Sequence, residues 1–128
     1  MIDHNLLADV PLFDGMSDEE LRDCAQLFDQ IRVLMGDVLT AKDDFGYSLF
    51  VVLEGAVRVE VDQDTTVDLG VGDHFGEVSM VTGAKRNATV RATETCQLAK
   101  IMIWNFEELT TRSPKLAERL RAAAAERS

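Results

Sequence analysis

Residues 75–90 read Phe-Gly-Glu-Val-Ser-Met-Val-Thr-Gly-Ala-Lys-Arg-Asn-Ala-Thr-Val, and they are the most informative segment of the sequence. Gly76 lets the backbone approach a ligand where a Cβ atom would collide. Arg86 carries a planar guanidinium, which matches two phosphate oxygens. Glu77 is an unusual neighbour for an anion unless it accepts a hydrogen bond from a hydroxyl group or pairs with Arg86 itself. A ligand with both a phosphate and a sugar hydroxyl suits the two side chains together.

The stretch resembles the phosphate-binding cassette of cyclic nucleotide-binding domains. The family pattern is Phe-Gly-Glu, then a small or apolar run, then Arg, a short residue and Ala-Thr-Val, which correspond here to 75–77 and 86–90. The resemblance implies that Arg86 contacts the exocyclic oxygens of a 3′,5′-cyclic phosphate and that Glu77 accepts a hydrogen bond from the ribose 2′-hydroxyl. The implied ligand-binding residues are Gly76, Glu77, Val78, Ser79, Arg86, Asn87 and Ala88.

The same resemblance describes the surroundings of the phosphate and the base. The Gly76 backbone is implied to lie against the ribose, and the amides of Ser79 and Asn87 to point at the phosphate. Asn87 stands where relatives carry Ala, Ser or Thr. A Thr there is associated with guanine preference, so Asn87 leaves the base undecided. The alternating valines of an earlier strand are either an apolar wall for the base or ordinary core; they are Val57, Val59 and Val61.

The composition indicates one acidic domain. The 128 residues, 46% of them hydrophobic, suffice for a single folded domain spanning 1–128. The net charge of −10 disfavours direct binding to nucleic acid or to an anionic membrane, because both require basic surfaces. Between residues 83 and 91 the sign reverses, since the ionisable residues there are Lys85, Arg86 and Arg91. The cassette is therefore a favourable place for an anion.

Residue types for catalysis or metal binding are sparse. Cys24 and Cys96 lack metal-ligand spacing and are expected to be buried thiols. His4 and His74 are isolated, which argues against the metal centre of a cupin, another jelly-roll family. We expect no enzyme, because the sequence offers no nucleophile–base pair, and no metal site or cofactor. The chain shows neither a membrane-spanning apolar run nor a signal region, which predicts a cytoplasmic location.

Helix signals occur at both ends of the chain. Residues 5–30 are a predicted helical part, in which Ser17 and Glu20 form a capping box. Residues 104–128 are predicted to hold two helices, with Ser113 as the N-cap of the second. The apolar face of the first helix is predicted to comprise Leu21, Cys24, Ala25, Phe28 and Ile31, at helical spacing.

Between these ends, residues 31–103 contain short β-rich runs separated by glycine and aspartate. The run 48–53 is nearly all apolar and predicts a strand buried on both faces, whereas 56–61 alternates and predicts one solvent-facing side. This spacing predicts a mainly β fold with flanking helices, an antiparallel β-sandwich or jelly-roll barrel of the type the resemblance implies. The predicted strands are 31–34, 38–41, 48–53, 56–61, 66–69, 88–93 and 96–103.

The resemblance implies a non-catalytic sensor that binds a cyclic nucleotide, with cAMP favoured over cGMP. In relatives the helix after the barrel moves over the nucleotide, so Leu116 and Leu120 are candidate lid residues, with simple packing on the barrel as the alternative. The expected output partner is an unknown effector protein or a second copy of the chain. Two alternatives stay open: a degenerate domain that acts as a protein-interaction module, and the sensor half of a larger transcription regulator or transporter.

Overall fold

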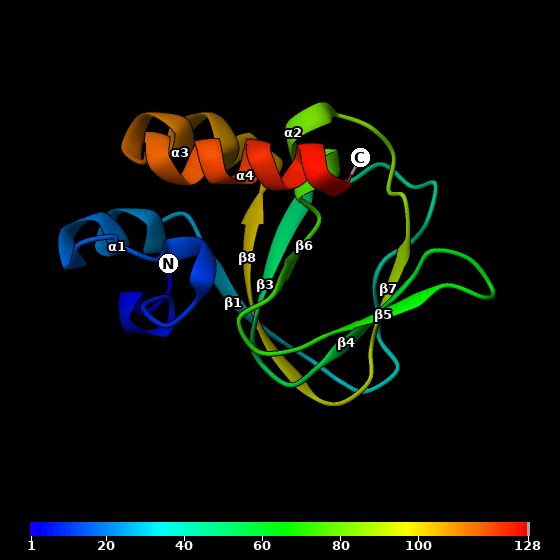
Figure 1. Ribbon diagram of the computed structural model, residues 1–128. Coiled ribbons are helices and arrows are strands. Elements are labelled where there is room, and N and C mark those ends of the chain that lie inside the picture. The colour runs from blue at the N-terminus through cyan, green and yellow to red at the C-terminus, as the bar shows by residue number, and fades with distance from the viewer. Residues whose placement is uncertain (128) are drawn as a thin grey trace.

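The buried strand predicted at 48–53 lies at the centre of the first of two β-sheets. The computed structural model describes residues 1–127 and contains two four-stranded antiparallel sheets with helices packed beside them (Figure 1). The first sheet has the order β1-β8-β3-β6, so β3 lies inside it. Its strands are β1 (Asp29–Val33), β8 (Cys96–Met102), β3 (Ser48–Glu54) and β6 (His74–Phe75).

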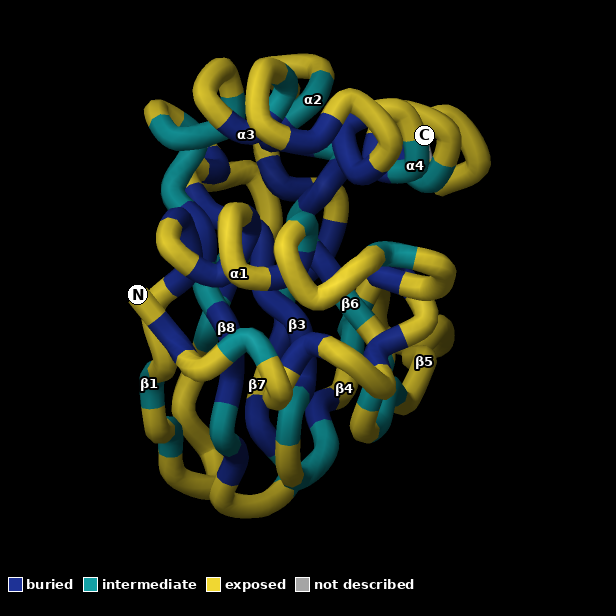
Figure 2. Tube along the Cα trace, turned by 90° about the vertical axis from the view of Figure 1, so that its left-hand side faces the viewer, coloured by how far each residue is buried: buried dark blue, intermediate teal, exposed yellow. Residues whose placement is uncertain are grey.

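The alternating residues of β3 explain why this strand is apolar on both faces. Leu49 and Val51 belong to a hydrophobic cluster shared with the helices. Phe50 and Val52 belong to a second cluster, which faces the other sheet. Figure 2 shows β3 and β8 as the buried centre of the molecule and the loops at its rim as exposed. The expectation of a strand buried on both faces is therefore confirmed.

The second sheet has the strand order β2-β7-β4-β5. Its cross-strand register places Val59 opposite Val90 on one side and opposite Val67 on the other. Val90 in turn lies opposite Thr40. Directly opposite residues of an antiparallel sheet share a face, so these four side chains form one row across the sheet. The strands are β2 (Val38–Thr40), β7 (Thr89–Ala92), β4 (Val57–Glu60) and β5 (Thr66–Leu69).

The two antiparallel sheets and their flanking helices confirm the predicted fold class. Helices α2, α3 and α4 lie at one end of the β-structure, with the cassette helix α2 next to α4, and α1 lies at the side of the first sheet (Figure 1). The helices are α1 (Asp18–Ala25), α2 (Glu77–Thr82), α3 (Phe106–Arg112) and α4 (Pro114–Arg127). Short 3-10 turns occur at η1 (His4–Leu6), η2 (Pro11–Phe13) and η3 (Ile103–Asn105). Within residues 1–127, none of the helices combines the length and the apolar character needed to cross a bilayer.

Helix α1 begins as predicted but ends early. The Ser17 hydroxyl accepts from the Glu20 N–H and the Glu20 carboxylate accepts from the Ser17 N–H, each at 3.2 Å, which completes the capping box. The prediction that its apolar face continues through Phe28 and Ile31 is wrong. Ile31 lies in β1, opposite Leu98 of β8. Pairing between these strands begins at Asp29, so long-range sheet formation overrides the helical spacing of the sequence.

Helix α4 is anchored at its start and packed along its length. The Ser113 hydroxyl accepts from the Leu116 N–H at 3.4 Å, as expected for an N-cap. Leu116 and Leu120 are fully buried and join the cluster that contains Leu49 of β3. This packing fixes the direction of α4, whose C-terminal end lies beside α2 (Figure 1).

Candidate functional site

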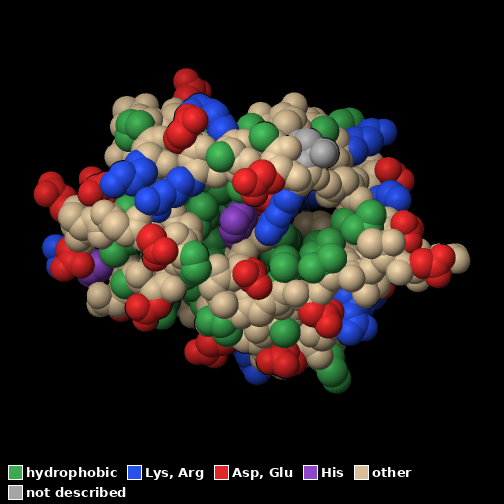
Figure 3. All heavy atoms as spheres, viewed as in Figure 1, with side chains coloured by type: hydrophobic (Ala, Val, Ile, Leu, Met, Phe, Trp, Pro, Cys, Tyr) green, Lys and Arg blue, Asp and Glu red, His purple; other side chains and the backbone are tan. Residues whose placement is uncertain are grey.

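A cavity of about 350 Å³ lies between the second sheet, the start of α2 and the end of α4. Its size falls within the usual range for small-molecule sites, about 300–1,000 Å³. Figure 3 shows a hollow beside hydrophobic side chains on this face of the molecule. All seven ligand-binding residues expected from the sequence line it. The lining residues are Thr40, Val59, Val61, Val67, Leu69, Phe75, Gly76, Glu77, Val78, Ser79, Arg86, Asn87, Ala88, Val90 and Arg127.

One end of the cavity is apolar and is made by the second sheet. The row that joins Thr40, Val90, Val59 and Val67 across four strands belongs entirely to the lining. Val67 lies in the edge strand β5, where only Val59 is opposite it among residues 1–127, and it keeps 50% of its surface exposed. This end therefore offers an uncovered apolar surface, the kind of surface against which a flat ring can pack.

The three alternating valines, two in β4 and one directly after it, have different environments. Val59 and Val61 line the cavity. Val57 is fully buried in the cluster between the sheets and is absent from the lining formed by the described residues. Phe75 of β6 also lines the cavity and stacks on Phe50, with 5.0 Å between ring centroids. The wall is thus built from two sheets, which the sequence pattern of β4 alone does not show.

Arg86 lies at the polar end, where two backbone carbonyls hold its guanidinium. Nη1 donates to the Gly76 carbonyl at 3.0 Å, and Nη2 donates to the Ser48 carbonyl at 2.6 Å. The residue is only 8% exposed. Burial lowers its pKa below the ordinary arginine value, against the opposing attraction of Glu77. The side chain nevertheless remains a cation at neutral pH, because an arginine pKa begins far above it.

Two glycines make room for this buried arginine. Gly76 has φ +97°, and a Cβ atom there would lie 2.6 Å from the Ser48 carbonyl oxygen and 2.8 Å from Arg86 Nη1. A Cβ atom at Gly46 would lie 2.6 Å from Arg86 Cζ and 2.5 Å from Ser79 Cβ. Sequence reasoning identified Gly76 and missed Gly46, whose only signal was a glycine within a polar loop that is distant in sequence.

Glu77 is the most deeply buried ionisable side chain of the cavity, at 1% exposure. Its Oε1 accepts a hydrogen bond from Arg127 Nη1 at 2.8 Å. Its Oε2 lies 4.0 Å from His74 Nε2, and neither atom has a hydrogen-bond partner among residues 1–127. Burial lowers the pKa of His74 despite the nearby Glu77 carboxylate. The ion pair of Glu77 is therefore with Arg127 and not with Arg86, the partner considered from the sequence.

Arg127 is the charged lining residue that sequence reasoning missed. Its Nη1 also donates to the His74 carbonyl at 2.8 Å, and its own carbonyl accepts from Asn87 Nδ2 at 3.5 Å. A signal was present, because Arg127 continues the stripe Leu116, Leu120 and Ala124 at helical spacing. Within the part of the chain that the structure describes, Leu116 and Leu120 do not line the cavity and pack in the core instead.

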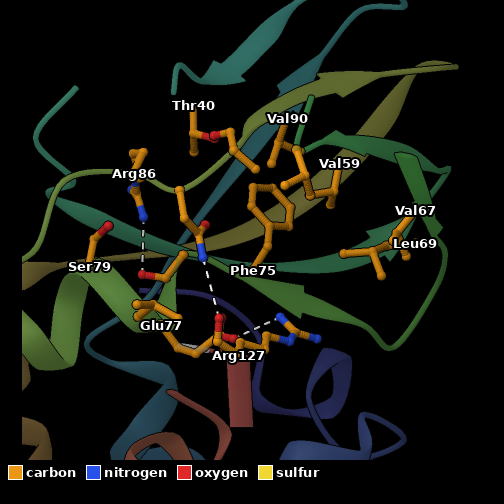
Figure 4. Close-up of a pocket in the computed structure, with 15 residues that line it drawn as sticks. Thr40, Val59, Val67, Leu69, Phe75, Glu77, Ser79, Arg86, Val90 and Arg127 are labelled. Carbon is orange, nitrogen blue, oxygen red and sulfur yellow. Dashed lines mark hydrogen bonds and ion pairs between the residues drawn. The ribbon is translucent and has the colours of Figure 1, made fainter. Parts of the chain in front are cut away.

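The cavity therefore has two chemically different ends. Figure 4 shows Ser79, Glu77 and Arg86 on one side and Val59, Val67 and Leu69 on the other, with Phe75 between them. A cation and a carboxylate at one end suit an anion and a hydroxyl group, whereas the other end suits an apolar ring. Residues 1–127 bring no three His, Cys, Asp or Glu side chains together as a metal site. Cys24 and Cys96 are buried free thiols, and burial raises the pKa of both.

The fold is a β-roll domain, and its cavity has the size of a small-molecule site. The cyclic nucleotide-binding domain family matches residues 30–113, more than half of the chain, and the chain belongs to that family. Domains of this family are typically regulatory and non-catalytic.

Relatives with this domain occur in several kinds of protein. A cyclic nucleotide-gated potassium channel of Rhizobium etli is 34% identical over 122 residues, which cover 95% of this chain and 34% of the channel. The crystal structure of the catabolite activator protein of Thermus thermophilus superposes with a TM-score of 0.83 at 30% identity, over 91% of this chain and 57% of that one.

The regulatory domain of Toxoplasma gondii protein kinase A, solved with cAMP, shares the fold. The superposition has a TM-score of 0.83 at 22% identity, and it covers 96% of the present chain and 48% of the Toxoplasma gondii chain. The present chain thus spans about a third of the channel's length and about half of each of these solved chains.

Proposed function

We propose that this chain is a non-catalytic sensor that binds a 3′,5′-cyclic nucleotide, with cAMP as its ligand. The observation that carries the proposal is the two-ended cavity, in which Arg86 and Glu77 face the same space as the valine row of the second sheet. A cyclic nucleotide has a phosphate and a ribose hydroxyl, which match the polar end with Arg86 and Glu77, and a planar base, which matches the apolar end. Arg86 would bind the phosphate and Glu77 the 2′-hydroxyl.

The phosphate end supports an anion because Arg86 keeps unused donors. A guanidinium has five N–H groups, and two hydrogen bonds to Gly76 and Ser48 carbonyls use only part of them. The chain as a whole has a net charge of −10, so a bound phosphate needs a local cation. The Gly76, Ser79 and Asn87 backbones and the neighbouring Val78 and Ala88 complete the proposed contact surface.

The apolar end supports adenine over guanine. Its walls are valine, leucine and phenylalanine, and the Thr40 hydroxyl already donates to the Ala88 carbonyl at 3.3 Å. Guanine carries more hydrogen-bonding groups on its ring edge than adenine does. Burying those groups against apolar walls without partners costs free energy, so cAMP is the favoured ligand and cGMP the weaker one.

The output of the sensor is proposed to be a shift of the C-terminal helices. Helix α4 carries Arg127 to the cavity and packs on α2, so a ligand that contacts the start of α2 prefers one arrangement of α4 over another. The receiver would be an effector protein, a second copy of the chain, or the remainder of a longer regulator or channel like the relatives.

Calorimetric titration with cAMP, and in parallel with cGMP, tests this proposal. We expect saturable binding with higher affinity for cAMP. Arg86→Ala is expected to weaken binding about ten-fold or more, because a hydrogen bond to a charged group contributes about 1.5–3 kcal/mol. Arg91→Ala is the matched control, since Arg91 is exposed, pairs with Glu60 and lies outside the lining traced along residues 1–127.

A protein-interaction module is the second candidate, and one observation favours it. In the structure Arg86 and Glu77 already have protein partners, since two backbone carbonyls accept from Arg86 and Arg127 pairs with Glu77 Oε1. Absence of binding heat and of a thermal shift with both nucleotides would contradict the sensor and favour this candidate. Unchanged affinity in Arg86→Ala would instead show that a nucleotide binds without a contribution from Arg86.

A further inference from the structure

One oxygen of the Glu77 carboxylate is held in an ion pair, and the other is buried without a hydrogen-bond partner among residues 1–127. Oε1 pairs with Arg127 Nη1 at 2.8 Å, and Oε2 is enclosed, 4.0 Å from His74 Nε2. Glu77 is 1% exposed, so solvent does not reach the carboxylate. A ribose hydroxyl therefore gains access to Glu77 only if its present ion-pair partner moves.

Arg127 also attaches the last turn of α4 to the cassette at two further points. Nη1 donates to the His74 carbonyl at 2.8 Å, and the Arg127 carbonyl accepts from Asn87 Nδ2 at 3.5 Å. Figure 4 shows Arg127 next to Glu77 at the edge of the cavity, with a dashed line for their ion pair. These contacts join residues that lie 50, 53 and 40 positions apart, so the end of α4 closes on both borders of the cassette.

We propose that Arg127 is an intramolecular competitor for Glu77, and that the ribose 2′-hydroxyl displaces it. The inference rests on the proposed function and specifies which ligand group acts on α4. Binding through the hydroxyl exchanges the Arg127–Glu77 pair for a hydroxyl–Glu77 hydrogen bond and releases the last turn of α4 from the cassette. The phosphate–Arg86 contact supplies the affinity that makes this exchange favourable.

The charge balance explains why the exchange requires a ligand. A buried carboxylate that loses its ion-pair partner and gains no hydrogen bond is disfavoured, so Arg127 stays in place when the cavity is empty. His74 does not replace Arg127, because burial keeps its imidazole neutral and its Nε2 lies 4.0 Å from Oε2. A ligand hydroxyl provides a hydrogen-bond donor at the moment the guanidinium leaves. The nucleotide and Arg127 therefore alternate as partners of one carboxylate.

Titrations of the wild type and of Arg127→Gln with cAMP and 2′-deoxy-cAMP test this competition. Removing the competitor is expected to raise cAMP affinity roughly two- to five-fold, the contribution of an ion pair with one partly exposed partner. The gain is expected to vanish with 2′-deoxy-cAMP, which has no hydroxyl for Glu77, and in the Glu77→Gln background. Arg121→Gln is the control, because Arg121 lies on the same helix and pairs with Glu118 at 3.9 Å.

The outcomes separate the inference from the proposed function. Arg127→Gln binding cAMP more weakly than the wild type, or equally, overturns the competition while nucleotide binding stands. An equal gain for cAMP and for 2′-deoxy-cAMP also overturns it, since the effect would then bypass Glu77. Absence of binding by the wild type and by Arg127→Gln overturns both. Binding by Arg127→Gln alone would show that Arg127 blocks the site, but it would overturn displacement by the nucleotide and the proposed function, since the wild type would not bind.

Discussion

Gly76 and Arg86 lie in such close contact that a Cβ atom at residue 76 would be 2.8 Å from Arg86 Nη1. Gly76 also has φ +97°, in the left-handed region. Gly83 shares this conformation, with φ +75°, but within the described chain an added Cβ would meet no atom within 4 Å. A side chain at Gly83 would therefore meet backbone strain alone, whereas one at Gly76 would meet both backbone strain and steric overlap.

Alanine substitutions at these glycines are expected to differ in cost. Gly83→Ala should lower the free energy of unfolding by about 1–2 kcal/mol through backbone strain alone. Gly76→Ala should cost more, because it adds overlap with Arg86 and with the Ser48 carbonyl. Gly70→Ala is the control, since that site has open space among the described residues and no strained φ. Urea unfolding measures all three, and equal costs at 76 and 83 would show that Arg86 moves away freely.

Val67 and Val71 provide a matched test of the apolar wall. Both are exposed valines, at 50% and 69%, but only Val67 belongs to the cavity lining traced within residues 1–127. Val67→Ser is expected to weaken cAMP binding about five-fold, because the base would bury roughly half a valine side chain, about 1 kcal/mol. Val71→Ser is expected to leave the affinity unchanged. Equal effects of the two substitutions in calorimetric titrations would show that the base does not pack against Val67.

The protonation of His74 is expected to make the stability of the domain pH-dependent. Burial lowers the pKa of His74 below its ordinary 6.5, against the attraction of Glu77 and Asp73 and in the same direction as Arg127. The folded state thus favours the neutral imidazole. The contribution of His74 to stability is full above pH 6.5 and is lost as the pH falls through that value toward the lower folded-state pKa.

Urea unfolding at pH values above and below 6.5 checks this expectation. His74→Gln should lose less stability than the wild type on acidification, because glutamine does not titrate. His4→Gln keeps His74 and is expected to retain the dependence of the wild type. A difference between wild type and His74→Gln that stays constant across the pH range would contradict the prediction.

Leu116 tests whether the apolar stripe of α4 packs in the core. It is fully buried, so Leu116→Ala is expected to cost about 2–5 kcal/mol through lost contacts and a residual cavity. Lys115→Ala, at an exposed neighbour on the same helix, is expected to have little effect. Thermal unfolding compares the two, with Leu116→Met as the milder variant if the alanine protein does not fold. Little loss of stability would show that α4 is weakly held and favour the lid interpretation for this leucine.

Much of this structure was predictable from short sequence patterns, because interactions between residues close in the sequence determine the strands and the helix cap. The alternation of 56–61 and the apolar run 48–53 each reflect which strand faces are covered, and both strands form there. The capping box at Ser17 depends only on residues three apart, so it was readable from the sequence. The cassette residues lie within one short segment, and all seven line the cavity. Their roles in binding stay predictions that the titrations test.

The missed features depend on contacts between distant segments. The end of α1 is set by pairing of β1 with β8, whose residues lie far along the chain. Gly46 is needed because Arg86 passes beside it, and a loop glycine does not reveal that neighbour. Arg127 reaches Glu77 because core packing of α4 sets the helix direction, which no local pattern specifies. Each case combines an ordinary residue with a partner that only the folded chain provides.

The two carbonyls that hold Arg86 lower the entropy cost of binding an anion. A free arginine side chain has about 2 kcal/mol of rotamer entropy to lose when it is fixed. In this domain the Gly76 and Ser48 carbonyls already fix the guanidinium before any ligand arrives. The ordering cost is therefore incurred during folding and not during binding. An arriving anion meets a side chain that is already oriented, so the loss of side-chain entropy takes little away from the free energy of binding.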